Sequence, residues 1–378
     1  MRLGIDARFL GPEGTGLGRY VQELILHLED LDKKNEYIIF LRRQNFDFYK
    51  AKNKNFKKVL ANTRWYSLKE QVILPFIFSS QKLDLLHVPH FNVPIFYPGK
   101  MVVTIHDLIK SEFASLSATT RVAPVYFFKH FGYKAILRIA LWRSQQIFVP
   151  SHQIAQKLQE KMKIAGEKIT VTYEASSLSD KQQVTSGKNI LEKYEIEKPF
   201  LLYVGNAYPY KNLDNLLKAL SILIHNLEFS IHGLKLVNPC SRSVFYERLA
   251  QKAKDMELSD KVILPGFVPD EELAVLFQQA EAYVFPSFSE GFGIPGLDAM
   301  ALGTPVICSN ILTLKEIYGV AALYFDPYSK EDIAEKIGKV LTNEKLRQDL
   351  IKKGKKQVQK YSWRKMAKET LEIYQSVC

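Results

Sequence analysis

The sequence predicts an α/β protein built from two Rossmann-like domains, each with a doubly wound parallel sheet. Short apolar segments such as 2–6 and 200–204 are followed by Gly-containing loops and then by helical periodicity, and this alternation recurs in both halves. A polar stretch without periodicity, 174–183, interrupts the pattern, and 378 residues exceed one typical core. Two such halves predict a cleft into which strand C-termini and helix N-termini point.

The individual elements follow from the same patterns. In the first half we expect further strands at 36–41, 83–88, 101–105 and 145–149, and helices near 67–78, 118–142 and 151–162. In the second half we expect strands at 228–232, 261–264, 282–285, 304–308 and 321–325, then a charged helical region at 329–360. Ser362 is expected to cap a last helix. The predicted divisions are a first domain at 1–177, a linker at 178–195, a second domain at 196–360 and a terminal helix at 361–378.

Composition narrows the class of protein. Three widely spaced cysteines, Cys240, Cys308 and Cys378, argue against a disulfide framework or a zinc site and favour a reducing, cytoplasmic setting. No apolar run is long enough to cross a bilayer, and we expect no secretory signal. The formal net charge of +12 favours anionic partners. Because no nucleic-acid-binding motif accompanies the charge, the anionic partners that we expect are phosphorylated substrates or an anionic membrane surface.

The stretch 125–143 is both basic and aromatic, and its spacing allows a helix. One interpretation is a helix that lies on anionic lipid, which would place the protein peripherally on the inner face of the cell membrane. The other, weighted about equally, is a helix packed on its own domain with its lysines and arginines in solvent.

The most informative segment is 287–306, in which Glu290 and Asp298 flank a Gly-rich turn, Gly291-Phe292-Gly293. The turn follows an apolar strand and leads into an apolar helix, which is expected to begin at Glu290. Backbone N–H groups at a helix N-terminus bind anions, and carboxylates accept hydrogen bonds from sugar hydroxyls. The pattern therefore predicts a site for a nucleotide sugar rather than an ordinary capped helix.

Two further loops contain candidate donor-binding residues. Gly205 and Asn206 leave a strand, and Lys211 then lies at a helix start, where its charge opposes the helix dipole. A bound diphosphate would resolve that conflict and would be neutralised by the ammonium group. The other loop, Thr15 to Arg19, has Gly16 and Gly18 between the first strand and helix. It is a weaker signal, for which a flexible turn is the simpler interpretation.

Histidines follow two strands of the first half. The strand at 101–105 ends in His106 and Asp107, which places an imidazole and a carboxylate at the carboxyl edge of the sheet. His106 could donate a hydrogen bond to a sugar hydroxyl, with Asp107 to orient it. His87 and His90 are weaker acceptor-side candidates, interpreted first as loop or wall residues. Two ligands are too few for a metal, so no metal and no cofactor are expected.

In their order and spacing, these motifs resemble the GT-B glycosyltransferases, and within them the retaining family four that includes bacterial mannosyltransferases. The resemblance implies that Glu290 contacts the donor sugar, that Lys211 binds the phosphates and that His106 lines the reaction centre. Asp298 occupies the place of a second glutamate that holds the ribose, and it is one methylene shorter. An arginine common in the family is absent, with Asn206 nearest its place. The resemblance also implies that the nucleotide binds the second domain, the acceptor the first, and that the last helix crosses back.

The function implied is transfer of a hexose, with mannose from GDP-mannose first, to a glycan or lipid-linked saccharide in surface polysaccharide synthesis. The sequence identifies no nucleophile for the far face of the sugar, so we expect the anomeric configuration to be retained through front-face attack. The alternatives are a UDP-sugar-dependent transferase, a nucleotide-sugar-modifying enzyme such as an epimerase, and a non-catalytic nucleotide-binding subunit of the same fold. No nucleic-acid partner is expected.

Overall fold

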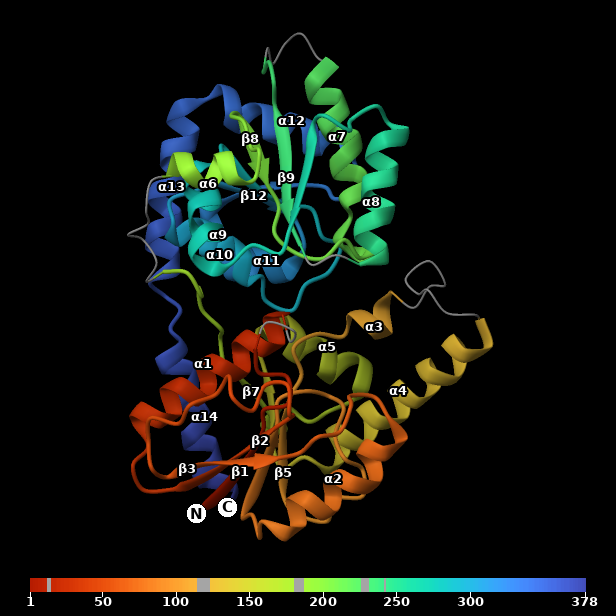
Figure 1. Cartoon of the computed structure of the whole chain (residues 1–378), viewed down its shortest axis with the longest axis vertical. Helices are drawn as coiled ribbons and strands as arrows, with labels where there is room; N and C mark the ends of the chain where they lie inside the picture. Colours follow the sequence, from red (N-terminus) through yellow and green to blue (C-terminus); the bar gives the residue numbers. More distant parts are fainter. Residues whose placement is uncertain (12–14, 114–122, 180–186, 226–230, 241–242) are drawn as a thin grey trace. The chain divides into compact units, whose positions relative to one another are not determined.

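The computed structural model describes residues 1–11, 15–113, 123–179, 187–225, 231–240 and 243–378 (Figure 1). These residues form two compact units. Unit 1 contains the described residues of 1–113, 123–174 and 362–378, and unit 2 those of 175–361. The chain therefore passes from unit 1 to unit 2 between Glu174 and Ala175, and it returns between Tyr361 and Ser362.

Unit 1 is a parallel sheet covered by helices on both faces. Its seven strands have the order β3-β2-β1-β4-β5-β6-β7, with bounds β1 (Arg2–Asp6), β2 (Glu36–Leu41), β3 (Phe56–Leu60), β4 (Leu85–Val88), β5 (Met101–Thr104), β6 (Ile147–Val149) and β7 (Ile169–Val171). Its helices are α1 (Thr15–Leu31), α2 (Leu68–Ser80), α3 (Ile109–Glu112), α4 (Ala123–Arg143), α5 (His152–Met162) and α14 (Trp363–Val377). Buried side chains of α2, α4 and α5 pack on one face, whereas α1 packs against α14 on the other (Figure 1).

Unit 2 repeats this architecture with six parallel strands in the order β10-β9-β8-β11-β12-β13. The strands are β8 (Phe200–Leu202), β9 (Lys235–Pro239), β10 (Val262–Gly266), β11 (Ala282–Phe285), β12 (Val306–Ser309) and β13 (Ala322–Phe325). The helices are α6 (Gly187–Lys193), α7 (Leu213–His225), α8 (Val244–Asp255), α9 (Asp270–Gln279), α10 (Ile294–Ala301), α11 (Leu312–Tyr318), α12 (Lys330–Thr342) and α13 (Glu344–Val358). Contacts of α7 with α12 and of α10 with α13 pair helices around this sheet (Figure 1).

The predicted α/β architecture is confirmed, and Ser362 caps α14 by accepting a hydrogen bond from the Lys365 amide. Two details of the strand prediction were wrong. The strand expected at 228–232 is β9, which begins at Lys235; residues 226–230 lie outside the described part of the chain. Two edge strands, β3 and β7, were not anticipated, because an edge strand that is half exposed lacks the continuous apolar run of a buried parallel strand.

Each sheet has one point at which the chain reverses the direction in which strands are added. In unit 1 this point lies between β1 and β4, and in unit 2 it lies between β8 and β11. The loops that leave the two strands turn to opposite faces there, so the carboxyl edge opens into a crevice that binds ligands in open α/β sheets. Most candidate residues of both units lie on loops or at helix starts at this edge, whereas Asp298 lies within α10.

Candidate active-site residues

The switch point of unit 2 brings together two loops that are far apart in the sequence. One follows β8 and ends in a 3-10 turn, Pro209–Lys211, and the other follows β11. The Phe288 amide donates to the Tyr210 carbonyl at 2.9 Å, and the Asn212 side chain donates to the Pro286 carbonyl at 2.9 Å. These hydrogen bonds fix the loops on each other, so the side chains that follow are held in one arrangement.

Lys211 and Glu290, both predicted from the sequence, form an ion pair between these loops. Lys211 Nζ lies 2.7 Å from Glu290 Oε1, and the side chains are only 16% and 10% exposed. The ammonium also lies 5.5 Å from the ring centre of Phe285 on β11. A cation and an acceptor are therefore held side by side in a partly desolvated place, the arrangement required to bind a phosphate next to a hydroxyl-bearing group.

The Gly-rich turn before α10 is tightly constrained. Gly293 has φ 102°, and a Cβ there would lie 2.4 Å from the hydroxyl of Tyr318, which donates to the Gly293 carbonyl at 2.6 Å. Only glycine fits this conformation and this contact. The helix begins at Ile294, so the expectation that it starts at Glu290 was wrong: the left-handed residue at Gly293 delays it, and Gly291 and Phe292 belong to the loop.

Asp298 lies on α10 and is only 6% exposed. Its Oδ1 accepts three hydrogen bonds, from the Ser176 hydroxyl at 2.8 Å, the Ser177 amide at 2.6 Å and the Leu178 amide at 3.1 Å. One carboxylate oxygen therefore holds the segment that enters unit 2 against α10. Sequence reasoning anticipated a ligand contact at Asp298 and gave no sign of this structural one.

In unit 1, His106 is held by groups on both ring nitrogens. Its Nδ1 lies 3.0 Å from Glu174 Oε1, and its Nε2 lies 3.2 Å from the Pro89 carbonyl, which can only accept. Tyr20 packs edge-on against the imidazole at 4.6 Å. Glu174 was missed as a site residue because it was included in the polar stretch at 174–183. The available signal was its position three residues after Val171, the last residue of β7.

The other histidines have different environments. His90 packs against Phe9 and accepts a hydrogen bond from the Asn92 amide. Its pKa lies well below the usual value, mainly because the imidazole is buried. His87 was expected in a loop or wall, but it lies inside β4 and is fully buried. There Tyr374 of α14 and Thr104 hydrogen-bond its two nitrogens, so it joins the terminal helix to the sheet.

Asp107 is exposed, and its Oδ1 accepts from the Ile109 amide at the start of α3. Asn206 lies in the loop after β8, and its carbonyl accepts from the Tyr203 hydroxyl at 3.2 Å. Gly205 in the same loop has φ 138°, a conformation that favours glycine. These contacts explain the local turns without assigning a ligand to them.

The loop Thr15 to Arg19 forms the first turn of α1 in unit 1. Gly16 is exposed with open space around it, whereas a Cβ at Gly18 would lie 2.4 Å from the Gly11 carbonyl. Gly18 therefore has a packing reason to be glycine. Arg19 is half-buried on the same turn.

Within the described ranges, no three His, Cys, Asp or Glu side chains are grouped so that they would hold a metal ion. Among the helices of the same residues, none combines the length and the apolar character that a membrane span requires.

Comparison with known proteins identifies both halves of the chain. Residues 14–175 match the family model "Glycosyltransferase Family 4", and residues 187–357 match "Glycosyl transferases group 1". The O-antigen chain mannosyltransferase RfbU of Salmonella typhimurium is 26% identical over 330 residues, which cover 84% of this chain and 85% of the relative. O-antigen chain mannosyltransferase B of Escherichia coli is 32% identical over 186 residues, 49% of this chain and 48% of the relative.

Solved structures share the fold over the whole chain. Sucrose-phosphate synthase from Thermosynechococcus elongatus superposes with a TM-score of 0.79 at 19% identity, covering 100% of this chain and 99% of the other. WaaG, a glycosyltransferase involved in lipopolysaccharide biosynthesis, gives 0.78 at 15% identity, covering 99% of each chain.

Proposed function

Because the chain belongs to the family 4, group 1 glycosyltransferases with the GT-B fold, we propose that it transfers mannose from GDP-mannose to a saccharide acceptor with retention of the anomeric configuration. The observation that carries the proposal is the Lys211–Glu290 pair at the switch point of unit 2. The donor sugar is taken from the mannosyltransferase relatives, RfbU and mannosyltransferase B, whose names place them in O-antigen synthesis.

In the proposed mechanism, Lys211 neutralises the negative charge that develops on the diphosphate as the glycosidic bond breaks. Glu290 accepts hydrogen bonds from the donor sugar and orients it. The departing phosphate oxygen accepts the acceptor's proton on the face from which the acceptor attacks, so no protein nucleophile is required. His106, whose two ring nitrogens are held by Glu174 and Pro89, lines the acceptor side of the site. Neither a metal nor a cofactor is required in this scheme.

The test is a ligand panel combined with product analysis. GDP, UDP and their sugars are compared by thermal unfolding, because a ligand at about 100 times its dissociation constant stabilises the folded state by roughly 2.7 kcal/mol. GDP and GDP-mannose should raise the unfolding temperature in the wild type but not in Lys211→Gln. Lys218→Gln, an exposed lysine on α7, is the matched control. A response to UDP alone would overturn the proposed donor.

Transfer is measured separately, with GDP-mannose and a mannoside acceptor, and the product's anomeric configuration is read by NMR. An α-linked product supports retention and a β-linked product contradicts it. Nucleotide binding without any transfer to a panel of saccharide acceptors would favour the non-catalytic alternative.

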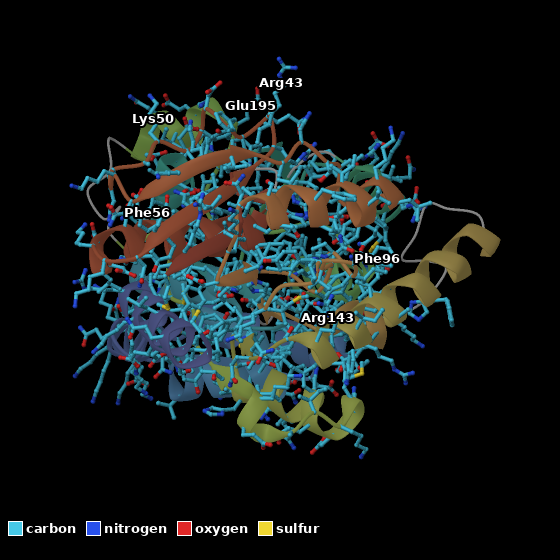
Figure 2. All side chains as sticks on the ribbon, turned by 90° about the horizontal axis from the view of Figure 1, so that it is seen from below. Arg43, Lys50, Phe56, Phe96, Arg143 and Glu195 are labelled. Atoms are coloured by element: carbon cyan, nitrogen blue, oxygen red, sulfur yellow. The ribbon has the colours of Figure 1, made fainter. Side chains whose placement is uncertain are left out.

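We also propose that unit 1 docks on an anionic bilayer, where a lipid-linked acceptor would be found. The buried side of α4 packs into the core through Leu137 and Leu141. Its other side exposes both aromatic and basic groups, Phe131, Lys134, Arg138 and Trp142. Phe96 is also 68% exposed, on the loop whose Ile95 carbonyl accepts from Arg143 (Figure 2). Apolar groups interleaved with cations suit the boundary between headgroups and acyl chains.

Flotation with vesicles of anionic and of neutral lipid tests this surface. Wild-type protein should float with anionic vesicles and much less with neutral ones. Trp142→Ser should reduce flotation, whereas Tyr328→Ser, an equally exposed aromatic residue in unit 2, should not. Failure of the wild type to float would contradict the docking proposal and leave the proposed reaction untouched.

A further inference from the structure

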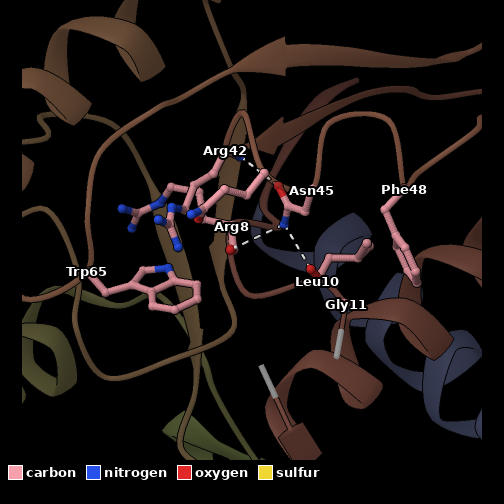
Figure 3. Close-up of a pocket in the computed structure, with 8 residues that line it drawn as sticks. Arg8, Leu10, Gly11, Arg42, Asn45, Phe48 and Trp65 are labelled. Atoms are coloured by element: carbon pink, nitrogen blue, oxygen red, sulfur yellow. Dashed lines mark hydrogen bonds between the residues drawn. The ribbon is translucent and has the colours of Figure 1, made fainter. Parts of the chain in front are cut away.

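Unit 1 contains a pocket that the proposed donor chemistry does not use. The cavity, of about 190 Å³, lies at the carboxyl ends of β1, β2 and β3 and is lined by Arg8, Leu10, Gly11, Arg42, Phe48 and Trp65 (Figure 3). We call it the Trp65 pocket. Its walls come from the loops that follow those three strands, on the edge of the sheet where ligands bind in this class of fold.

Arg8 belongs to the wall and has no donor left for a ligand. Its guanidinium donates to both Asp6 oxygens at 2.8 Å, to the Thr63 hydroxyl at 3.0 Å and to Glu70 Oε1 at 2.6 Å, with a further contact to the Thr63 carbonyl. Glu70 Oε2 in turn accepts from the Tyr66 amide and the Asn92 side chain. The network behind the pocket is therefore saturated, and it makes a rigid floor.

Trp65 and Arg42 form another part of the pocket lining. The indole N–H of Trp65 is buried, and none of the residues that the structure describes accepts a hydrogen bond from it. Arg42 places its guanidinium 4.5 Å from the Trp65 ring centre, and its side chain extends toward the same side of the pocket as the indole (Figure 3). Gln44 also lines the cavity. Because an unpaired buried donor costs free energy, the pocket is built for a ligand that supplies oxygen acceptors.

The apolar part of the pocket fits a flat, partly apolar ligand. Phe9 stacks on Trp65 with the rings 4.3 Å apart and nearly parallel, so with Arg42 over the ring a ligand meets the indole at its N–H edge. Phe48, by contrast, is 53% exposed and offers its ring beside Leu10 and Gly11. An aromatic face combined with a few hydrogen-bond donors is suited to a pyranose ring, which has C–H faces and an equator of oxygens.

The pocket also adjoins the residues that face the acceptor in the proposed function. Phe9, which stacks on Trp65, lies 5.0 Å from the ring of His90. The carbonyl of the preceding residue, Pro89, accepts from His106. The Trp65 pocket is thus one aromatic ring away from His90 and on the same sheet edge as His106.

From this geometry we infer that the Trp65 pocket binds an acidic pyranose of the acceptor glycan, at a position other than the sugar that receives the transferred residue. Arg42 holds the carboxylate, Trp65 donates to a ring or hydroxyl oxygen, and Phe48 contacts a C–H face. The inference rests on the proposed glycosyltransferase function and adds the chemical class of one acceptor residue. No covalent step occurs in this pocket.

The experiment titrates the whole protein with sodium glucuronate, methyl α-glucopyranoside and inorganic phosphate, by isothermal calorimetry or ligand-observed NMR. Glucuronate should bind more tightly than the neutral glucoside, and added salt should narrow the difference. Arg42→Gln should weaken glucuronate binding roughly tenfold or more. Trp65→Phe, which keeps an aromatic ring but removes the pyrrole ring with its N–H, should weaken it about threefold to tenfold. Arg43→Gln, whose side chain extends outward from the next position (Figure 2), should bind like the wild type.

Three results would overturn the inference: no binding of glucuronate, binding that Arg42→Gln leaves unchanged, or phosphate bound as tightly as glucuronate, since any small oxyanion would then suffice. The GDP-dependent rise in unfolding temperature is measured on the same variants and should persist in Arg42→Gln and Trp65→Phe. A wild-type protein that binds GDP and performs transfer but does not bind glucuronate would refute this pocket alone. Glucuronate binding without any response to nucleotide would instead refute the proposed function.

Discussion

The Lys211–Glu290 pair allows a prediction in which stability and activity separate. At 2.7 Å, the attraction between two unit charges is about 6 kcal/mol for an effective dielectric constant near 20, before desolvation is subtracted. Breaking a fully buried pair by removing one partner costs about 3–5 kcal/mol. Because the side chains keep 16% and 10% of their exposure, water screens the charge left behind. We therefore expect Glu290→Gln and Lys211→Gln each to lower the free energy of unfolding by about 2 kcal/mol.

The double variant leaves no uncompensated charge, so its loss should be smaller than the sum of the two single losses, with a coupling of about 1–3 kcal/mol. Turnover should not recover in this way. Lys211 contacts the diphosphate of the donor and Glu290 contacts its sugar, and losing one such electrostatic contact lowers kcat by about 10²–10³-fold. The double variant should therefore be more stable than the single variants predict, and no more active than either.

Urea unfolding measures the stability part, with the transition of unit 2 identified as the one that GDP shifts to higher denaturant. Initial rates with GDP-mannose measure the activity part. Strictly additive losses of stability would show that the pair has no energetic coupling. Turnover at the wild-type level in either single variant would refute the assigned roles.

Three other predictions follow from the described contacts. Burial lowers the pKa of His87 to about 3, so below about pH 6.5 the unfolded chain binds a proton at this histidine and the folded chain does not. The free energy of unfolding should therefore fall as the pH drops from about 6.5 toward 3, by up to about 1.4 kcal/mol per pH unit. The fall should be less steep in His87→Gln than in the exposed control His225→Gln. Asp298→Ala should lower the free energy of unfolding by about 2–4 kcal/mol, because the Ser177 and Leu178 amides and the buried Ser176 hydroxyl lose their acceptor, and unchanged stability would contradict that role. Glu174→Gln should lower kcat while the dissociation constant for GDP stays the same; equal loss of both would indicate general damage instead.

The fold was predictable because its signals are local. Buried parallel strands such as β11 read as short apolar runs, and amphipathic helices such as α7 show their buried face in the spacing of leucines. The failures are also local in origin. The edge strand β3 contains Lys57 and Lys58, so it lacks the apolar signal, and only its pairing with β2 makes it a strand.

The candidate site was predictable only in part, because contacts across the sequence are set by topology. Lys211 and Glu290 could be named individually from their loops. Their ion pair depends on β8 and β11 being neighbours, which no periodicity reveals. The start of α10 was misplaced for a different reason: the left-handed conformation of Gly293 and its fit to Tyr318 belong to packing, not to propensity.

The segment from Glu174 to Ser176 has a polar partner in unit 1 at its first residue and a polar partner in unit 2 at its last. Glu174 faces His106 within unit 1, and Ser176, two positions later, donates to Asp298 within unit 2. A carboxylate accepting two amides and a hydroxyl on one oxygen tolerates little displacement. The shorter side chain of Asp298, compared with the glutamate that the family resemblance leads one to expect, is therefore explained by a backbone segment that approaches α10 closely. The added methylene in Asp298→Glu would push that segment away, so introducing the glutamate found in the family should weaken, rather than improve, the anchoring of residues 176–178.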